Sequence, residues 1–346
     1  MPKVPETVSS LLRLRAWRVG VYALPIQVCY FSIFYLGLKT GEVFEVQQLL
    51  LLVLSLWLYL AYIVLVNDYA DRSVDAAVGK GTVERGHGLS SVQVESLLVL
   101  IVVVNGAAVY TIGRGIFFDS LWVLAYILGT TYSLPPFSLK QRGAAGLVVD
   151  SVIEKPLPIL FTFAFFGYYG FEVLFFPILG ELLDAVFKHQ AHDYEIDVKT
   201  NLRTFAVSLG KSTSDRLVNK YLLPLDAVVV VVAFVTVMAE IPQLRYSTAL
   251  VLAGMLIALA LTFLKAGRFL IKPVSENWSE PLHWEDPPYV VFFNAGFFTF
   301  LTSSLALALV VQSPAYLALG LLFFASLAPY IVAYSVVALV RLKLLR

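Results

Sequence analysis

Three aspartates at helical spacing follow the second apolar segment of the chain. Asp68, Asp71 and Asp75 are three and four residues apart, and Asn67 lies four residues before Asp71. On a helix this spacing places the three carboxylates on one face. Clustered carboxylates repel one another unless a cation neutralises them, and Mg²⁺ often binds between a few carboxylates and substrate phosphates. The segment therefore predicts a Mg²⁺-phosphate site, and the alternative interpretation is a solvated charged surface.

A second acidic cluster ends the sixth apolar segment. Asp193 and Asp197 are four residues apart, and His189 lies four residues before Asp193, so all three can share one helix face. Two cations follow closely, Lys199 and Arg203, and both suit phosphate oxygens. Two acidic clusters that face each other would hold a diphosphate through bridging Mg²⁺. The metal ions would help the diphosphate to leave, because they stabilise charge on the departing oxygens.

The elements that carry these clusters are apolar segments long enough to cross a bilayer. Of the 346 residues, 59% are hydrophobic and 14% are charged, and the mean hydropathy is +0.81. These values exclude a soluble enzyme and a disordered protein, and the net charge of +1 excludes a nucleic-acid binder. A single cysteine excludes a disulfide framework. A membrane helix needs about 20 apolar residues. Ten segments are predicted to span the membrane: 20–38, 47–66, 91–112, 118–134, 147–169, 172–190, 221–240, 247–270, 289–311 and 315–340.

Lysine and arginine predict the direction of these spans. With a cytoplasmic N-terminus, 21 of the 25 Lys and Arg residues lie on the cytoplasmic side and three lie outside. Both acidic clusters then lie at the cytoplasmic face of a plasma (inner) membrane. The sequence thus predicts an all-α polytopic membrane protein with about nine or ten transmembrane helices. Its parts are a cytoplasmic segment at 1–19, a helical core with both clusters at 20–270, and C-terminal transmembrane helices at 271–346.

Charged residues also occur inside the fifth span. Asp150 and Glu154 are four residues apart and share a face. Charges within a span are costly and usually face an interior cavity. One interpretation is that they bind a second substrate or take a proton from it, and the other is an internal pair of Glu154 with Lys155. Pro156 and Pro158, which follow, predict a kink in this helix.

The sixth span carries a polar stripe that leads to the second cluster. Glu181, Asp184 and Lys188 are three and four residues apart, on the same face as His192. They are expected to line a cavity, and the alternative is a local Asp184–Lys188 pair.

Three motifs in this order resemble a known family. Asn-Asp-x-x-Asp-x-x-x-Asp at 67–75 resembles the first aspartate-rich motif of the UbiA superfamily of intramembrane prenyltransferases, and Asp-x-x-x-Asp at 193–197 resembles the second. Tyr-Ser-x-Pro-Pro followed by Lys, at 132–140, is similar to a third family segment. The resemblance covers roughly residues 20–270, and it implies a ring of helices around a central cavity.

The resemblance also implies roles for individual residues. Lys140 and Arg203 would contact phosphate oxygens, and Tyr132 and Ser133 would line the pocket near the reacting carbon. Arg85 stands in the region where the family often has an Arg-Pro segment. The implied ligands of Mg²⁺-diphosphate are Asn67, Asp68, Asp71, Asp75, Asp193 and Asp197. The predicted catalytic residues are Asp68, Asp71, Asp193, Asp197, Lys140 and Tyr132. The predicted substrate contacts are Asn67, Asp75, Ser133, Arg85, Arg203, Asp150, Glu154, Lys188 and His192.

The implied reaction is Mg²⁺-dependent transfer of a prenyl group within the membrane. A prenyl diphosphate would lose its diphosphate, and a hydrophobic small-molecule acceptor would capture the allylic cation, with membrane lipid around the site. The first alternative is a terpene cyclase of the same superfamily, which ionises the donor without an acceptor. A transporter with acidic coupling sites and an inactive membrane scaffold are the others. The acceptor, the prenyl chain length and the oligomeric state are left open by the sequence.

Overall fold

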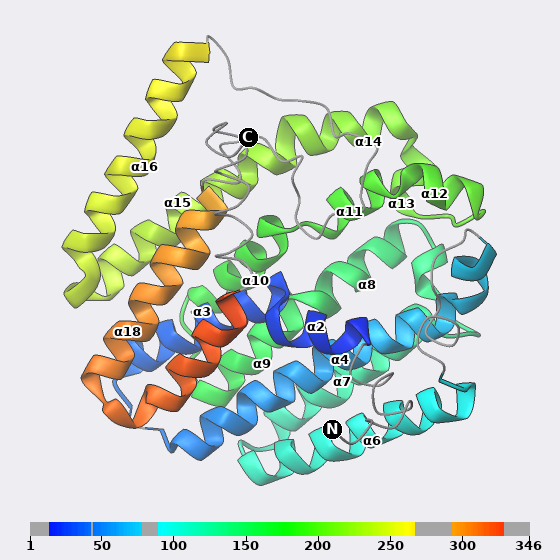
Figure 1. Cartoon of the computed structure of the whole chain (residues 1–346), viewed down its shortest axis with the longest axis horizontal. Helices are drawn as coiled ribbons and strands as arrows, with labels where there is room; N and C mark the ends of the chain where they lie inside the picture. Colours follow the sequence, from blue (N-terminus) through cyan, green and yellow to red (C-terminus); the bar gives the residue numbers. More distant parts are fainter. Residues whose placement is uncertain (1–13, 43, 78–88, 267–292, 329–346) are drawn as a thin grey trace, which may run out of the picture.

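The computed structural model describes residues 14–42, 44–77, 89–266 and 293–328, and all secondary-structure elements within these ranges are helices. The predicted all-α class is confirmed. Figure 1 shows long helices packed side by side, with several shorter ones gathered around α11 to α14. The first elements are α2 (Arg15–Tyr22), α3 (Leu24–Thr40), α4 (Val46–Ala77), α6 (Ser91–Ile112), α7 (Ile116–Ser133), η1 (Leu139–Gln141), α8 (Ala144–Glu154) and α9 (Pro156–Phe166). The following elements are α10 (Glu172–Leu183), α11 (Val186–His192), α12 (Tyr194–Lys199), α13 (Phe205–Leu209), α14 (Lys211–Leu217), η2 (Val218–Leu222), α15 (Leu223–Glu240), η3 (Pro242–Leu244), α16 (Arg245–Ala266), η4 (Gly296–Thr302), α18 (Ser303–Gln312) and η5 (Pro314–Tyr316).

Several of the described helices are suited to a bilayer. By length and composition, five of them can cross it: Val46–Arg72, Ser91–Ile112, Ile116–Ser133, Lys211–Glu240 and Phe293–Gln312. The predicted number of spans and the predicted orientation stay predictions. Helix α6 exposes apolar side chains along its length, among them Val99, Val103 and Tyr110. Such exposed apolar surface is typical of a helix that faces lipid.

Helix α3 forms the centre of the packed core. Fifteen of its 17 residues are buried. Its aromatic side chains meet helices distant in sequence, because the Phe31 ring lies 5.0 Å from that of Phe176 on α10 and 4.7 Å from that of Phe297 on η4. Aromatic pairs at these distances add to the stabilisation from burial. The core thus joins α3 to α10 and to η4 near the C-terminal end of the described chain.

Helix α4 is longer than the membrane is thick, and this length positions the first acidic cluster. At 1.5 Å per residue, its 32 residues extend about 48 Å, compared with about 30 Å for a bilayer's hydrocarbon core. The apolar sequence continues as far as Val66, and polar residues begin at Asn67. The cluster therefore lies on the last turns of the helix, beyond its apolar part.

The predicted fifth and sixth spans are each divided into two helices. Lys155 separates α8 from α9, and residues 184–185 separate α10 from α11. Pro156 opens α9, which confirms the predicted kink, because proline lacks the backbone N–H that would continue α8. The two breaks are adjacent in space, since Lys155 Nζ donates a hydrogen bond to the Asp184 carbonyl at 2.7 Å. Two broken helices therefore meet at one level of the bundle.

Candidate functional site

The first acidic cluster receives the lysine of the Tyr-Ser-x-Pro-Pro segment. Helix α7 ends at Ser133, and the chain then turns so that the short helix η1 carries Lys140 back toward α4. The Lys140 ammonium forms an ion pair with Asp71, and its Nζ lies 3.4 Å from Asn67 Oδ1. Ser133 Oγ lies 3.4 Å from the same Asn67 oxygen. Four predicted site residues are therefore brought together, although they come from two regions about 65 residues apart.

The structure adds Arg15 to this cluster, a residue that the sequence did not indicate as part of the site. Helix α2 packs along α4, and Arg15 Nη2 donates to Asp68 Oδ1 at 2.5 Å. The sequence showed Arg15 only as one of the basic residues before the first span. Because a guanidinium can bind carboxylate and phosphate oxygens alike, Arg15 is a further candidate for phosphate contact.

The second acidic cluster lies at the junction of α11 and α12. Asp193 occupies the position between the two helices, and the Asp197 N–H still donates to the Asp193 carbonyl at 2.8 Å. The helical spacing predicted for these two residues is therefore preserved. Asp197 is buried, and its Oδ2 accepts a hydrogen bond from Thr204 Oγ1 at 3.0 Å. Thr204 also accepts from the Val207 N–H as the N-cap of α13, so one hydroxyl connects the aspartate to the next helix.

A backbone contact joins the second cluster to the lysine segment. The Gly143 N–H donates to the Arg203 carbonyl at 3.1 Å, and Gly143 and Thr204 form an isolated parallel bridge. Gly143 lies three residues after Lys140, and Thr204 contacts Asp197, so the lysine segment touches both acidic regions. The Arg203 side chain is exposed. This arrangement places the three motifs around one end of the bundle (Figure 1).

The chemistry of these side chains fits Mg²⁺, which prefers carboxylate and amide oxygens. Asp68 and Asp71 keep 18% and 24% of their side chains exposed, so both are accessible to an ion. Within the described ranges, no three His, Cys, Asp or Glu side chains are grouped closely enough to hold a metal. A bound Mg²⁺ would therefore share its coordination with phosphate oxygens and water, as this ion commonly does. The Asp75 side chain and all of Arg85 lie outside the described residues.

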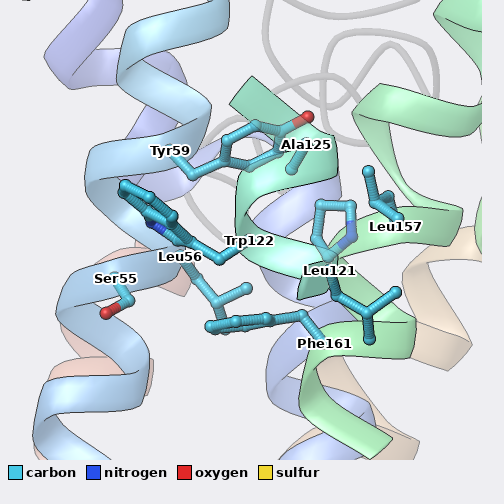
Figure 2. Close-up of a pocket in the computed structure, with 9 residues that line it drawn as sticks. Ser55, Leu56, Tyr59, Leu121, Trp122, Ala125, Leu157 and Phe161 are labelled. Atoms are coloured by element: carbon cyan, nitrogen blue, oxygen red, sulfur yellow. The ribbon is translucent and has the colours of Figure 1, made fainter. Parts of the chain in front are cut away.

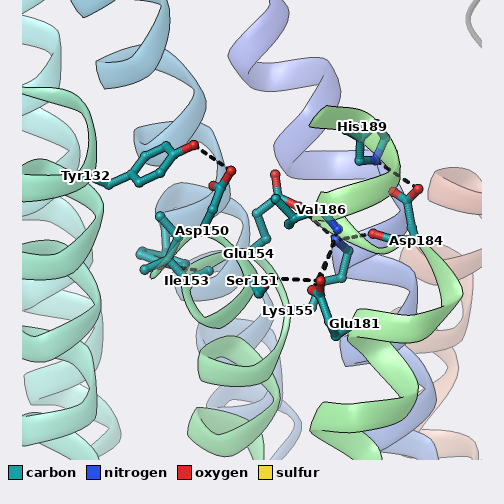
Figure 3. A network of polar contacts seen from close by, with 11 residues as sticks. Tyr132, Asp150, Ser151, Ile153, Glu154, Lys155, Glu181, Asp184, Val186 and His189 are labelled. Carbon is teal, nitrogen blue, oxygen red and sulfur yellow. Dashed lines mark hydrogen bonds and ion pairs between the residues drawn. The ribbon is translucent and has the colours of Figure 1, made fainter. Parts of the chain in front are cut away.

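A second polar network begins beside the lysine segment, on the face of α8 (Figure 3). Tyr132 precedes Ser133, and its hydroxyl donates to Asp150 Oδ2 at 2.6 Å. One turn further along α8, Glu154 Oε2 accepts from Lys155 Nζ at 2.8 Å. The internal Glu154–Lys155 pair that the sequence suggested is thus present. Asp150 contacts the Tyr132 hydroxyl instead, so the two carboxylates of this face have different partners.

Lys155 and Glu181 satisfy backbone groups at the break between α10 and α11. Lys155 is fully buried and donates to the Asp184 carbonyl, while Glu181 Oε1 accepts from the Val186 N–H at 3.0 Å and from Ser151 Oγ at 2.9 Å. An unsatisfied backbone group inside a membrane costs several kcal/mol. The break between α10 and α11 is therefore stabilised by Lys155 from the other broken helix and by Glu181 from its own (Figure 3).

The polar stripe of the sixth span lies partly in this network. His189 Nε2 lies 2.9 Å from Asp184 Oδ1, so the Asp184 carboxylate meets an imidazole of the next turn. Lys188 is buried, and His192 is half-buried next to Asp193. The stripe thus extends from the helix break to the second acidic cluster.

A small apolar pocket lies between α4, α7 and α9 (Figure 2). Trp122 and Phe161 form part of its wall, and Tyr59 lines it while donating to the Ile153 carbonyl at 2.8 Å. The pocket residues of α4, from Ser55 to Tyr59, precede Asn67 by eight to twelve residues. At 1.5 Å per residue, the pocket begins about 12 Å and ends about 18 Å below the first acidic cluster.

These features define an all-helical membrane protein with paired acidic motifs at one end of its bundle. The profile of the UbiA prenyltransferase family matches residues 28–270, which is most of the chain, and the protein belongs to that family. The fold agrees. A UbiA homolog from Archaeoglobus fulgidus covers 88% of this chain and 99% of its own at a TM-score of 0.57 and 18% identity. The same homolog bound to GPP and Mg²⁺ gives a TM-score of 0.56 at 19% identity, covering 85% of this chain and 99% of that one.

A curated relative is similar over a shorter stretch. The probable homogentisate phytyltransferase 2, chloroplastic, of Oryza sativa subsp. japonica is 30% identical over 160 residues. These residues are 43% of this chain and 41% of the relative, so the match spans about two fifths of the relative's length. The comparison supports the family, and the activity of this chain is argued below from its own residues.

Proposed function

We propose that this protein transfers a prenyl group from a prenyl diphosphate to a hydrophobic acceptor inside the membrane, with Mg²⁺ as cofactor. The observation that carries the proposal is the position of Lys140. Its ammonium contacts Asp71 of the first acidic motif, while its segment bonds to the second motif through Gly143 and Thr204. A cation between two acidic motifs suits a diphosphate held by metal ions. Membership of the UbiA family supports this interpretation.

The donor would bind at the ends of α4 and α11. Bound Mg²⁺ would be held by Asn67, Asp68, Asp71, Asp75, Asp193 and Asp197, and it would neutralise charge on the departing diphosphate. Lys140 and Arg15 already contact these carboxylates and are within reach of phosphate oxygens bound to the same ligands. Arg203 would approach from the second motif. The carbon–oxygen bond of the donor breaks with both electrons on the diphosphate, which leaves an allylic cation.

The acceptor would meet this cation beside Tyr132 and Asp150. As the new bond forms, the acceptor loses a proton, and Asp150 is placed to accept it because its Oδ2 already accepts a hydrogen bond from Tyr132. Glu154 would contribute to acceptor binding on the same face of α8. Lys188 and His192 would complete the wall on the α11 side. These roles are proposals for the residues that the sequence indicated.

The prenyl tail would extend along the apolar side chains that line the pocket between α4, α7 and α9. The pocket lies on the interior side of the first cluster, so a donor anchored by its diphosphate at Asn67 can direct its chain toward Tyr59 and Trp122. Each CH₂ group buried there contributes about 0.8 kcal/mol. We further propose that both motifs face the cytoplasm at a plasma membrane, with the N-terminus on that side, because this orientation leaves most Lys and Arg residues inside.

The proposal is tested by diphosphate release from detergent-purified protein. The assay supplies Mg²⁺ and prenyl diphosphates of about 10 to 20 carbons, with and without a membrane-lipid extract. Release that requires both Mg²⁺ and the extract supports a transferase, and release without any acceptor indicates a cyclase instead. We expect Asp193→Asn to abolish release while the protein still inserts. Full activity of that variant, or no release from the wild type under any condition, would contradict the proposal.

A further inference from the structure

Two short helices that follow the second acidic motif, α13 and α14, fold back onto it. We infer that residues 204–215, the clamp segment, hold the second motif in the geometry that binds metal, and that Lys211 is the positioning residue for Asp193. This inference rests on the proposed function, in which Asp193 and Asp197 bind Mg²⁺-diphosphate. It adds to that site a residue that lies outside the three motifs.

The clamp segment is packed against the helices that carry the motif. Helix α13 contacts both α11 and α12, and α14 contacts α11 and α13 (Figure 1). Gly210 connects α13 to α14 at φ +83° and ψ 150°, a conformation that is essentially confined to glycine. Ser214 Oγ on α14 donates to the Ala206 carbonyl on α13 at 3.1 Å, and both residues are fully buried. The two helices therefore form one unit beside the motif.

Lys211 contacts the chain on both sides of Asp193. Its Nζ donates to the Ala191 carbonyl at 3.0 Å, and the same ammonium lies 5.8 Å from the centre of the Tyr194 ring. Ala191 is in the last turn of α11, where the carbonyls have no partner within their own helix and a lysine can satisfy them. One ammonium thus holds the turn between α11 and α12, and Asp193 is the residue at that turn.

The ion pair that Lys211 forms within α14 is secondary to this contact. Lys211 Nζ lies 3.2 Å from Asp215 Oδ1, and the two side chains are one helical turn apart. They are 38% and 37% exposed, and an exposed pair of this kind contributes little to stability. The contact of Lys211 with the motif is therefore the one through the Ala191 carbonyl.

The other end of the clamp segment holds the second carboxylate of the motif. Thr204 donates to Asp197 Oδ2 at 3.0 Å and is the N-cap of α13. The position of Asp197 is thereby fixed by the start of α13, and that of Asp193 by the start of α14. Mg²⁺ requires near-octahedral geometry, so it tolerates little error in the positions of its ligands. Loss of a group that orients a metal ligand commonly lowers metal affinity by roughly 10- to 100-fold.

The test measures binding of inorganic diphosphate in the presence of Mg²⁺, by calorimetry on the full-length protein in detergent. This measurement requires no turnover. We expect Lys211→Met to weaken binding by roughly 10- to 100-fold, because the turn at Asp193 loses its cation. Lys211→Arg keeps a charged donor for the Ala191 carbonyl and should bind within about threefold of the wild type. Wild-type affinity in Lys211→Met, or an equal loss in Lys211→Arg, overturns the inference and leaves the proposed function intact.

Two matched variants separate the clamp contact from a general loss of charge. Lys220→Met removes a cation that also lies over a tyrosine ring, that of Tyr221 at 5.3 Å, but on η2 outside the clamp segment. Asp215→Asn removes the ion pair and leaves the contact of Lys211 with Ala191 in place. Both variants should bind Mg²⁺-diphosphate like the wild type. An equal loss of affinity in either of them overturns the inference.

Thermal unfolding distinguishes a positioning role from a structural one. Because 38% of the Lys211 side chain is exposed, Lys211→Met should keep its Tm within about 3 °C of the wild type while its affinity falls. A loss of affinity that is accompanied by a larger fall in Tm overturns the inference in favour of a structural role. If the wild type itself does not bind diphosphate with Mg²⁺, the proposed function fails, and the inference fails with it.

Discussion

Replacing Lys140 by glutamine should change metal binding and donor turnover in opposite directions. In the structure the Lys140 ammonium is paired with Asp71, and its side chain is only 7% exposed. Without a donor, the ammonium therefore competes with a metal ion for the same carboxylate. With a donor bound, the same ammonium is proposed to contact a phosphate oxygen. Lys140→Gln should consequently tighten Mg²⁺ binding to the donor-free protein and weaken catalysis.

The magnitudes follow from the geometry of the pair. Two unit charges 4 Å apart interact with about 4 kcal/mol at an effective dielectric constant of about 20. Because Asp71 is 24% exposed, solvent screening reduces this value, and we expect about 1–2 kcal/mol, or roughly 5- to 30-fold tighter Mg²⁺ binding. A hydrogen bond to a charged group contributes about 1.5–3 kcal/mol. Its loss should lower kcat/KM for the prenyl diphosphate by roughly 10- to 150-fold.

Two measurements on the same preparation check this prediction. Calorimetric titration with Mg²⁺ in the absence of donor gives the metal affinity, and diphosphate release at saturating Mg²⁺ gives kcat/KM. Lys39→Gln is the control, because Lys39 also pairs with a carboxylate, that of Glu240. Lys39 lies in the last turn of α3, away from the acidic motifs. Weaker Mg²⁺ binding in Lys140→Gln would refute the reasoning, because it would show that the ammonium does not compete for Asp71. Unchanged turnover would refute the proposed phosphate contact.

Three further substitutions test other parts of the site. Thr204→Val removes the hydroxyl that donates to buried Asp197, so we expect Mg²⁺-dependent donor binding to weaken by about 1–3 kcal/mol. The measurement is the KM for the donor, and an unchanged KM would contradict the proposed role of Asp197. Lys155→Met leaves Glu181 and the Asp184 carbonyl without their buried cation and should destabilise the protein by about 3–5 kcal/mol, visible as a lower Tm in detergent. Phe161→Ala enlarges the apolar pocket, so the preferred donor should become longer by about one isoprene unit; the same product profile as wild type would argue against this pocket as the tail site.

The sequence by itself determined the class of the protein and predicted the residues of its proposed donor site. The length of an apolar segment and the spacing of carboxylates on a helix are local properties, and they can be read without knowing how helices pack. The helical class and the kink at Pro156 were predicted from such local properties, the UbiA family was predicted from the resemblance of three motifs, and all three are confirmed. The family resemblance also implied that Lys140 serves the same site as Asp71, and the two side chains are in contact.

The tertiary structure decided which side chains meet, and this decision depends on packing between distant segments. Arg15 is 53 residues from Asp68, and no local pattern distinguishes it from the other basic residues before the first span. The pairing of Lys155 with the Asp184 carbonyl requires that two helices break at the same level, which neither segment specifies alone. The same packing leaves Glu154 accessible and buries Lys155, because burial is set by neighbouring helices and not by residue type.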